Sequence, residues 1–517
     1  MTEIADIFVP LEALGEPLAR LAARSLGRSP ERIGEVRVLR RSLDARKGRR
    51  LGYQMRVALL QPGESSAPSI AARSVPAWPA GQAPPRVVIV GSGPAGAWAA
   101  LRLAEAGVPA TILERGKTVQ PRRRDLAMLQ RGTLDPESNY CFGEGGAGTY
   151  SDGKLYTRSK DRAGVTAVLT DLVRFGAPPE VEIDARPHVG SNLLPRVLTN
   201  LRLHLEGLGV KYVFGAEAAG LRARRGRLAA VALRDGGEIE AEVAVIAVGH
   251  SARTAYDWLL AGGIPLERKD IAVGVRIEHP QPVIDRLQYG EHAGHPLLPP
   301  AFYELRAAAT GRDLYSFCMC PGGWIVPAAT EPDGVVVNGM SLSRRDSPFA
   351  NAGMVVSICA ADFGPAGEGP LAGVAFQRCI ERAAFHAAGG GFRAPAQRLE
   401  DFLAGKPSRT LPASSYHRGI TGRPLDEIFP SFVTAALRDG LESLTRRLRG
   451  FAHPDAVLIA AETRTSAPVR ILRDATTLES PGLAGLYPAG EGAGYAGGIV
   501  SAALDGMRIA DAILRRA

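Results

Sequence analysis

Three glycines, Gly91, Gly93 and Gly96, have the spacing G-x-G-x-x-G that is typical of dinucleotide-binding turns. An apolar run at 87–90 precedes them, and a helix-forming stretch at 97–106 follows them. In such a turn the first glycine allows a tight bend, the second lets the backbone approach a pyrophosphate, and the third lets the helix pack on the strand. The start of the helix also favours the negative charge of the phosphates.

The chain after this turn completes a β-α-β unit. A second apolar run at 110–113 predicts a parallel strand that ends at Glu114, eighteen residues after the last glycine of the motif. A carboxylate at that position accepts hydrogen bonds from the ribose hydroxyls of an adenosine. The unit therefore predicts a Rossmann-type site for the adenosine half of a cofactor. Its further expected contacts are Pro94, Ala95 and Arg115.

A second glycine-rich segment lies near the C-terminus, at 485–498. Only one helix of chain follows it, so it does not begin a second dinucleotide-binding domain. It can instead hold the ribityl chain and the ring of FAD, because Glu491 ends a predicted strand and its carboxylate can accept a ribityl hydroxyl. A helix that begins at about Gly497 would point its positive end at the N1/C2 edge of the ring, where negative charge gathers on reduction, with Ile499 as a further expected contact. The expected glycines of this site are Gly490, Gly497 and Gly498.

Four strings of residues resemble a bacterial family of uncharacterised FAD-dependent dehydrogenases, also described as NAD(P)/FAD-dependent oxidoreductases, within the glutathione-reductase-like class. The strings lie at 87–96, 139–155, 316–323 and 487–501. The resemblance implies an FAD-binding fold and an oxidoreductase, and it leaves the substrate open.

The resemblance also implies roles for two other segments. Gly145 and Gly146 correspond to a double-glycine loop that passes beneath the cofactor. In the disulfide reductases this loop continues into a C-x4-C redox pair, whereas Thr149 and its neighbours follow here, so disulfide chemistry at this loop is not expected. The strand that ends at Gly249 resembles the alanine/threonine-glycine motif of the class, which also lies near the cofactor.

Cys318 and Cys320 are candidates for redox chemistry near the ring. Residues i and i+2 of one strand point to the same face but are too far apart for easy disulfide geometry. We therefore interpret them as lining of the pocket, with a redox role as the alternative. The sequence has no second cysteine or histidine pair at ligand spacing, so no metal site is expected.

Other side chains are candidates for the substrate site by type and place. Lys154 follows the double-glycine loop and can orient a carboxylate or stabilise negative charge, and its alternative is a surface lysine. Arg464 and Arg470 flank a proline-stiffened turn and suit an anionic substrate, unless they form ion pairs that brace the chain. Candidates for acid–base chemistry by residue type are His250, Tyr416 and His417.

The elements that must position these residues fall into several units. Helical spacing at 11–27 and extended runs at 33–39 and 53–60 predict a small α+β module over 1–60. Six prolines make 61–85 a linker. The remaining units form an α/β fold, namely a Rossmann-type FAD-binding domain over 86–264, with a β-meander, an inserted α+β substrate domain over 265–455, and a return of the FAD-binding domain over 456–517.

Composition excludes several classes of protein. The chain of 517 residues is 45% hydrophobic and 22% charged, which is typical of globular domains. Its net charge of +9 is spread along the sequence, so nucleic-acid binding is not favoured. Five cysteines, no leader and no apolar run of about 18 residues predict a cytoplasmic protein with no membrane span.

These observations predict a flavoenzyme in which N5 of FAD exchanges a hydride with a small organic substrate. NAD(P)H is a potential partner that would bind transiently over the ring. The alternatives are a flavin monooxygenase, a flavoprotein that modifies RNA, and a binding module in which FAD is structural. The sequence leaves the substrate, the direction of the reaction and the oligomeric state open.

Overall fold

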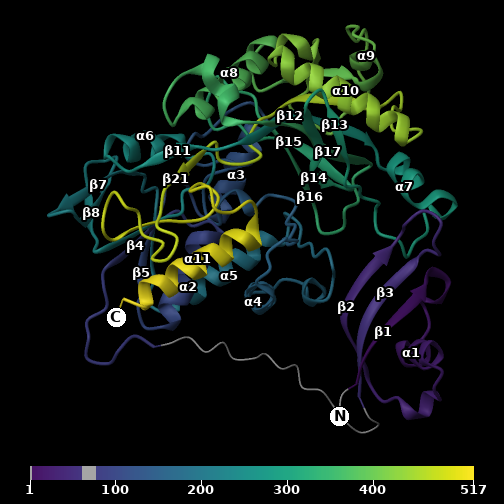
Figure 1. Ribbon diagram of the computed structural model, residues 1–517, viewed down its shortest axis with the longest axis horizontal. Coiled ribbons are helices and arrows are strands. Elements are labelled where there is room, and N and C mark those ends of the chain that lie inside the picture. The colour runs from purple at the N-terminus through teal and green to yellow at the C-terminus, as the bar shows by residue number, and fades with distance from the viewer. Residues whose placement is uncertain (1–2, 61–76, 517) are drawn as a thin grey trace.

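The computed structural model describes residues 3–60 and 77–516, and its elements form three groups (Figure 1). A small N-terminal module lies at one side of the molecule and contacts it through Arg41. An α/β half contains both glycine-rich segments. A larger sheet carries most of its helices on one face.

Five parallel strands form the centre of the α/β half, in the order β22-β10-β4-β5-β6. β4 and β10 are buried at every position, as expected for strands that are covered on both faces. Three helices pack on one face, and a meander packs on the other. This arrangement confirms the predicted α/β fold class. The strands are β4 (Val87–Val90), β5 (Ala110–Glu114), β6 (Lys211–Phe214), β10 (Val243–Ile246) and β22 (Leu486–Pro488); the helices are α2 (Pro94–Glu105), α5 (Leu194–Gly207) and α11 (Ile499–Leu514); the meander is β7 (Ala218–Arg224), β8 (Arg227–Leu233) and β9 (Glu238–Glu240).

The C-terminal helix α11 lies along α2, the first helix of the β-α-β unit (Figure 1). A side chain at Gly506 would overlap the carbonyl oxygen of Ala95, so the two helices approach through bare backbone. Asp505 on α11 accepts a hydrogen bond of 2.7 Å from the backbone N–H of Gly490. The end of the chain therefore locks the second glycine-rich segment onto the first.

A seven-stranded, mostly antiparallel sheet forms the core of the other half, in the order β13-β14-β17-β12-β20-β18-β19. Helices α8, α9 and α10 cover one of its faces (Figure 1). A separate hairpin, β15–β16, packs beside it. The elements are β12 (Ile271–Pro280), β13 (Arg306–Ala309), β14 (Arg312–Cys320), β15 (Gly323–Pro327), β16 (Val337–Ser341), β17 (Phe349–Ile358), β18 (Ala394–Arg398), β19 (Ile420–Gly422), β20 (Val457–Glu462), α8 (Ala372–Ala387), α9 (Leu399–Leu403) and α10 (Ser431–Arg447).

The return to the FAD-binding half begins later than the boundary expected at 456. β20 belongs to the seven-stranded sheet, where it pairs with β12 and β18. Its six buried residues resemble a Rossmann strand in sequence, but their partners lie in the antiparallel sheet. The link back is a two-stranded ribbon of β11 (Leu266–Arg268) and β21 (Val469–Ile471).

The N-terminal module is a three-stranded antiparallel sheet in the order β1-β3-β2, with α1 packed on it. The helix expected over 11–27 begins only at Leu18, because Pro17 precedes it and a short 3-10 turn occupies the first part. The sequence interpretation missed one strand of this sheet, β1, which pairs with β3. The elements are β1 (Glu3–Pro10), α1 (Leu18–Leu26), β2 (Val36–Asp44) and β3 (Gly52–Leu59). Of the expected linker 61–85, residues 61–76 lie outside the described part of the chain.

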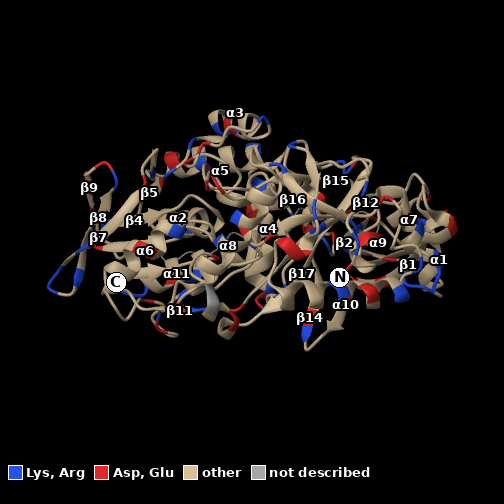
Figure 2. Cartoon of the chain, turned by 90° about the horizontal axis from the view of Figure 1, so that it is seen from above, with Lys and Arg blue, Asp and Glu red and all other residues tan. Residues whose placement is uncertain are grey.

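Four more helices connect these units, and none was assigned from the sequence: α3 (Val119–Leu129), α4 (Arg162–Arg174), α6 (Arg253–Ala261) and α7 (Gln281–Tyr289). Within residues 3–60 and 77–516, no helix combines the length and the apolar composition needed to cross a membrane. Basic and acidic residues are interspersed along the elements (Figure 2).

Gly506→Ala tests the contact between α2 and α11. The added methyl group would collide with backbone that cannot rotate away, so we expect a loss of about 1–3 kcal/mol in the free energy of unfolding. The measurement is urea unfolding followed by circular dichroism. Gly207→Ala is the matched control, because this helical glycine has no neighbour within 4 Å of the new Cβ and alanine favours helix. Equal stability of the two variants would contradict the packing described.

Candidate functional site

Four segments that are distant in sequence meet through backbone atoms at one edge of the parallel sheet. A Cβ on Gly91 would overlap the carbonyl oxygen of Ala247, and a Cβ on Gly492 would overlap that of Gly249. A Cβ on Gly146 would lie 3.1 Å from the Cα of Gly93. The first glycine turn, the double-glycine loop, the strand end at 247–249 and the C-terminal segment are therefore in direct contact, as the sequence predicts for parts of one site.

Each glycine of the first motif has a distinct environment. Gly91 has φ +108°, a conformation that favours glycine. A Cβ on Gly96 would overlap the carbonyl oxygen of Gly91, so Gly96 permits the helix to pack against the turn. Gly93 faces open space, since its nearest neighbour would be 3.9 Å from a Cβ. These three environments match the expected roles in bending, packing and approach to a phosphate.

The N-terminus of α11 is also free of side chains. Gly497 and Gly498 have no neighbour within 4 Å of a built Cβ, and both are exposed. Ile499, the first residue of the helix, lies over the double-glycine loop, because a Cβ on Gly148 would meet its side chain at 3.2 Å. A flat group can therefore approach this helix end closely.

Glu114 has a different environment from the one expected. Its carboxylate already accepts hydrogen bonds from the N–H and Oγ of Ser92 and from the N–H groups of Gly116 and Gly143. These four bonds occupy the usual acceptor positions of a carboxylate. Glu114 lines the cavity, but its first role is to hold the turn and the loop together. Arg115, next to it, lies 4.2 Å from the ring centre of Phe142.

Arg122 is a structural residue of the site that the sequence interpretation missed. It is fully buried on α3 and donates hydrogen bonds to the carbonyl oxygens of Asn139, Tyr140, Glu144 and Gly146. Burial lowers its pKa, and nearby acidic groups partly offset this effect. In the sequence Arg122 begins a basic run at 122–124 of the kind found on solvated surfaces, so no signal separated this buried arginine from its two neighbours.

The four backbone segments that meet at the sheet edge, namely the first glycine turn, the double-glycine loop, the strand end at 247–249 and the C-terminal segment, are called the glycine cradle. A cavity of about 1680 Å³ runs from this cradle to the seven-stranded sheet. Most of the predicted site residues line it: Gly91, Gly93, Pro94, Ala95, Glu114, Arg115, Gly146, Lys154, Gly249, His250, Cys318, Arg464, Gly490, Glu491, Gly497, Gly498 and Ile499. Four predicted residues do not: Gly96, Gly145, Cys320 and Arg470. Gly145 packs behind the loop, where a Cβ would overlap Leu198 and Thr149.

Lys154 belongs to a polar cluster at the end of the cavity that faces the sheet. Its Nζ lies 3.2 Å from Oδ2 of Asp152, and Nη2 of Arg345 lies 3.2 Å from the same oxygen. His188 lies 3.8 Å away, and the hydroxyl of Ser341 donates to the other oxygen. Burial would raise the pKa of Asp152, but Lys154, Arg345 and His188 hold it well below its usual range. The sequence offered one signal for Asp152, its place two residues before Lys154 on an extended segment.

Cys318 and Cys320 lie on opposite sides of the cavity wall, which corrects the expectation that they share a face. β14 has an irregularity between Phe317 and Cys320, and Cys318 has a left-handed φ of +42°. Cys318 is exposed to the cavity, whereas Cys320 is buried behind it, 3.5 Å from Nζ of Lys154. Burial raises the pKa of both thiols, that of Cys320 to about 11, so both are protonated at neutral pH. Protonated thiols are weak nucleophiles.

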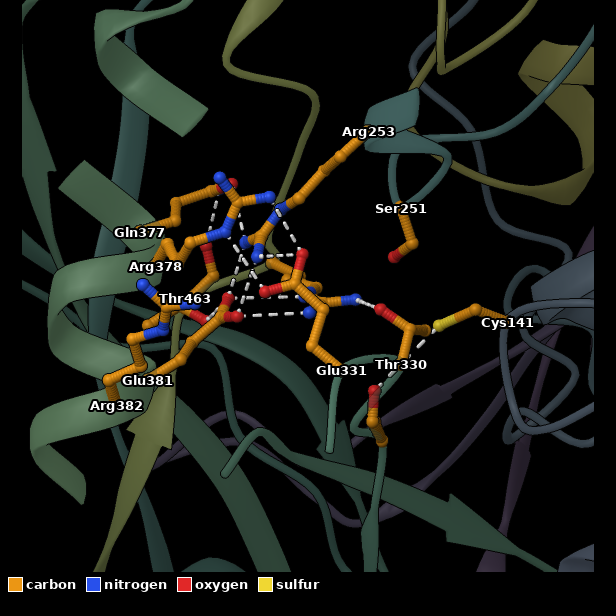
Figure 3. Close-up of polar contacts among 12 residues, drawn as sticks. Cys141, Ser251, Arg253, Thr330, Glu331, Gln377, Arg378, Glu381, Arg382 and Thr463 are labelled. Carbon is orange, nitrogen blue, oxygen red and sulfur yellow. Dashed lines mark hydrogen bonds and ion pairs between the residues drawn. The ribbon is translucent and has the colours of Figure 1, made fainter. Parts of the chain in front are cut away.

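Arg464 is held in a buried ionic cluster around Glu381, whose other members include Arg253 and Thr330 (Figure 3). Its guanidinium pairs with both oxygens of Glu381, at 3.1 and 2.9 Å, and donates to Thr330. Arg253 at the start of α6 pairs with the same carboxylate, at 2.7 and 2.9 Å. Arg464 therefore forms an ion pair that braces the chain, which was the alternative, and its guanidinium is not a free binding site for an anion.

Three other candidates lie outside the cavity. Arg470 is an exposed residue of β21 that pairs with Glu267 at 3.0 Å. Tyr416 is buried and donates to the carbonyl oxygen of Phe392, and His417 is exposed. Type and position in the sequence could not reveal these environments, because each partner comes from a distant segment.

His250 and Glu491 line the cavity with strongly shifted pKa values. Burial, together with Arg464 and Arg253, lowers the pKa of His250 to about 4, and Ser251 Oγ lies 2.8 Å from its Nδ1. Burial raises the pKa of Glu491 to about 7, with Lys269 partly offsetting it. Near pH 7 His250 is neutral and Glu491 is poised between its two forms. Among the described residues, no group of three or more His, Cys, Asp or Glu side chains could hold a metal ion.

Three family models match the chain in succession. A domain of unknown function matches 1–59, an FAD binding domain matches 85–135, and the model described as "FAD-dependent protein, C-terminal domain-like" matches 270–465. An uncharacterized protein of Clostridium beijerinckii is 39% identical, with 96% of this chain and 96% of that chain covered.

Solved flavoprotein structures give distant matches. Glycine oxidase from Geobacillus kaustophilus is 15% identical, with 83% of this chain and 95% of that chain covered and a TM-score of 0.37. A geranylgeranyl bacteriochlorophyll reductase-like protein from Thermoplasma acidophilum is 14% identical, with 83% and 78% covered and a TM-score of 0.35. At these scores the likeness carries no inference about chemistry.

Glu381→Gln tests the ionic cluster. Removing the carboxylate charge leaves the buried Arg464 without a carboxylate partner and Arg253 with Glu331 alone, so we expect a loss of about 3–5 kcal/mol in the free energy of unfolding at pH 7. Burial opposes ionisation of Glu381, but Arg253 and Arg464 lower its pKa from 4.5 to about 2. A lowered pKa contributes stability that is complete above pH 4.5 and is lost as the pH falls towards 2.

The difference between wild type and variant should therefore be constant above pH 4.5 and shrink below it. Denaturant unfolding at pH 3, 5 and 7 measures this difference. Glu267→Gln, which breaks an exposed pair, should change stability by about 1 kcal/mol or less. A pH-independent difference would show that Glu381 is not ionised in the cluster.

Proposed function

This chain belongs to the same family of FAD-dependent proteins as the Clostridium beijerinckii relative, and from that membership we propose that it is an oxidoreductase in which FAD exchanges a hydride with a small organic substrate. One observation carries the proposal. A single cavity joins the glycine cradle to the Lys154 cluster on the sheet, so a cofactor and a second ligand can share one space.

The cradle fits FAD in shape and in chemistry. Bare backbone at Gly91, Gly93 and Gly146 and the N-terminus of α2 suit the two phosphates. Arg115 faces the adenosine end of the cavity, and Glu491 suits a ribityl hydroxyl. The open start of α11 accommodates the flat ring. Drug-sized ligand pockets occupy about 300–1,000 Å³, so a cavity of about 1680 Å³ leaves room for more than one ligand of that size.

FAD supplies the redox chemistry when it is bound, and the chain supplies binding and proton transfer. His250 is neutral near pH 7 because burial and two arginines lower its pKa, and Ser251 engages its Nδ1. In the tautomer in which Nδ1–H donates to Ser251 Oγ, Nε2 is the acceptor nitrogen and can take a proton from a ligand in the cavity. Lys154 is charged, since Asp152 offsets the effect of burial and raises its pKa. It favours negative charge at the end of the cavity that faces the sheet.

The electron donor or acceptor is a second part of the proposal. The helix that follows Gly497, α11, packs along α2 and completes the first nucleotide-binding unit rather than beginning a second one. NAD(P)H would therefore bind transiently in the cavity, beside the ring. The interspersed charges in Figure 2 are typical of a solvated surface, so we do not extend the proposal to RNA.

Purified protein tests the proposal directly. We expect a yellow protein that releases FAD rather than FMN on heating, and flavin absorbance that bleaches under anaerobic NADH, NADPH or substrate. In Gly96→Val the new side chain would overlap the Gly91 carbonyl, so FAD content should fall to near zero while circular dichroism keeps its α/β signature. Gly207→Val, on a helix far from the turn, should keep its FAD. A wild-type protein that cannot bind FAD would refute the proposal.

The affinity for FAD should depend on the ionisation of Glu491. Its pKa of about 7 means that binding through the carboxylate form tightens about tenfold from pH 6 to pH 8. Glu491→Gln should remove this dependence and weaken binding at pH 8 by about 1–2 kcal/mol. Titration of the apoprotein with FAD by fluorescence quenching measures both effects, with Glu267→Gln as the control outside the cavity. An unchanged pH profile in Glu491→Gln would contradict the assigned role.

A further inference from the structure

The end of the cavity that faces the sheet carries an excess of buried positive charge. Lys154 and Arg345 both lie 3.2 Å from one oxygen of Asp152, which is 4% exposed. His188, 3.8 Å from the same oxygen, adds no charge at neutral pH, because burial and Arg345 lower its pKa to about 4. The thiol of Cys320 beside Lys154 is protonated. Two cations therefore face one anion, and one positive charge remains for a ligand.

Two hydrogen-bonding groups at this end have no partner among the residues that the structure describes. They are Nε of Arg345 and the hydroxyl of Tyr303, and both side chains line the cavity. Tyr303 is nine-tenths buried, at 9% exposure. Both atoms have almost no accessible surface, so they lie behind the cavity wall and take no part in the ligand contacts.

The walls around this charge are flat and apolar. The guanidinium of Arg186 lies 4.3 Å from the ring centre of Phe302 and 5.7 Å from that of Tyr156. Tyr156 is 54% exposed and Leu297 is 51% exposed, although both are large hydrophobic residues of the cavity lining. Exposed apolar surface of this kind is typical of a binding site.

The N-terminal module completes this wall. Tyr53 and Leu43, from β3 and β2, line the cavity. The module is held there by backbone hydrogen bonds from Arg41 N–H to Ile183 and from Ala185 N–H to Arg41. The entrance is therefore built from two parts of the chain that are far apart in sequence.

We propose that this half of the cavity binds a substrate with one carboxylate and a flat apolar body. The carboxylate pairs with Lys154 and Arg345, and the body lies against Tyr156, Phe302 and Leu297. One net positive charge matches a monoanion better than a dianionic phosphate, and a guanidinium fork matches the two oxygens of a carboxylate. This inference rests on the proposed function and names the class of its substrate. It also replaces Arg464 and Arg470 as the expected anion site, because both oxygens of Glu381 pair with Arg464 and Arg470 lies outside the cavity.

Calorimetry on the FAD-loaded protein tests the inference with matched probes. We expect 3-phenylpropanoate to bind at least tenfold more tightly than 3-phenylpropanamide, which has the same shape without the charge, and more tightly than acetate, which lacks the body. Lys154→Met and Arg345→Met should each remove the preference for the carboxylate. Arg345→Lys, which keeps the charge, should retain most of it and guards against a failure of the other variants to fold. Phe302→Ala should weaken both phenyl probes alike.

Arg470→Gln, outside the cavity, is the control and should bind like wild type. Equal affinity for acid and amide, a preference that survives Lys154→Met and Arg345→Met, or no binding of any probe at 10 mM would overturn the inference. FAD content is measured on every sample. A wild type without FAD refutes the proposed function, whereas a yellow protein without the preference refutes only the substrate class.

Discussion

The close approach of Gly96 to the carbonyl oxygen of Gly91 is the constraint on which the rest of the site depends. It brings the start of α2 against the end of β4, and the same principle of bare backbone against bare backbone recurs at Gly492 and Gly506. The contact of Gly492 joins the end of the chain to Gly249, and that of Gly506 joins it to Ala95. The shape of the cradle is therefore set by contacts between main-chain atoms, and these contacts also fix the positions of its side chains.

Parts of the molecule that depend on neighbouring residues were predictable from the sequence. The first β-α-β unit is local, because strand, turn and helix follow one another within residues 87–114, and apolar runs mark the buried strands. The second cofactor segment was predictable because Glu491 and the glycines at 490–498 keep their order around a strand end. The structure places both segments at one cavity.

Features that depend on distant partners were not predictable. Glu381 lies on α8, 83 residues before Arg464 in the loop after β20, so no spacing rule connects the two. The turn of Cys318 away from Cys320 follows from the irregular pairing of β14 with β17, which alternation within one strand cannot show. β20 reads as a Rossmann strand because a central antiparallel strand that is covered on both faces has the same apolar composition.

The order of the strands in the parallel sheet has a consequence for synthesis on the ribosome. β10 and β22 are neighbours in the sheet, yet the whole seven-stranded unit lies between them in the chain. At a synthesis rate of about 5–20 residues per second, roughly 10–50 s pass between the synthesis of β10 and that of β22. During this interval the edge of β10 is an open template for other strands. A chaperone would protect the nascent chain during this interval. The interval ends only when α11 has left the ribosome.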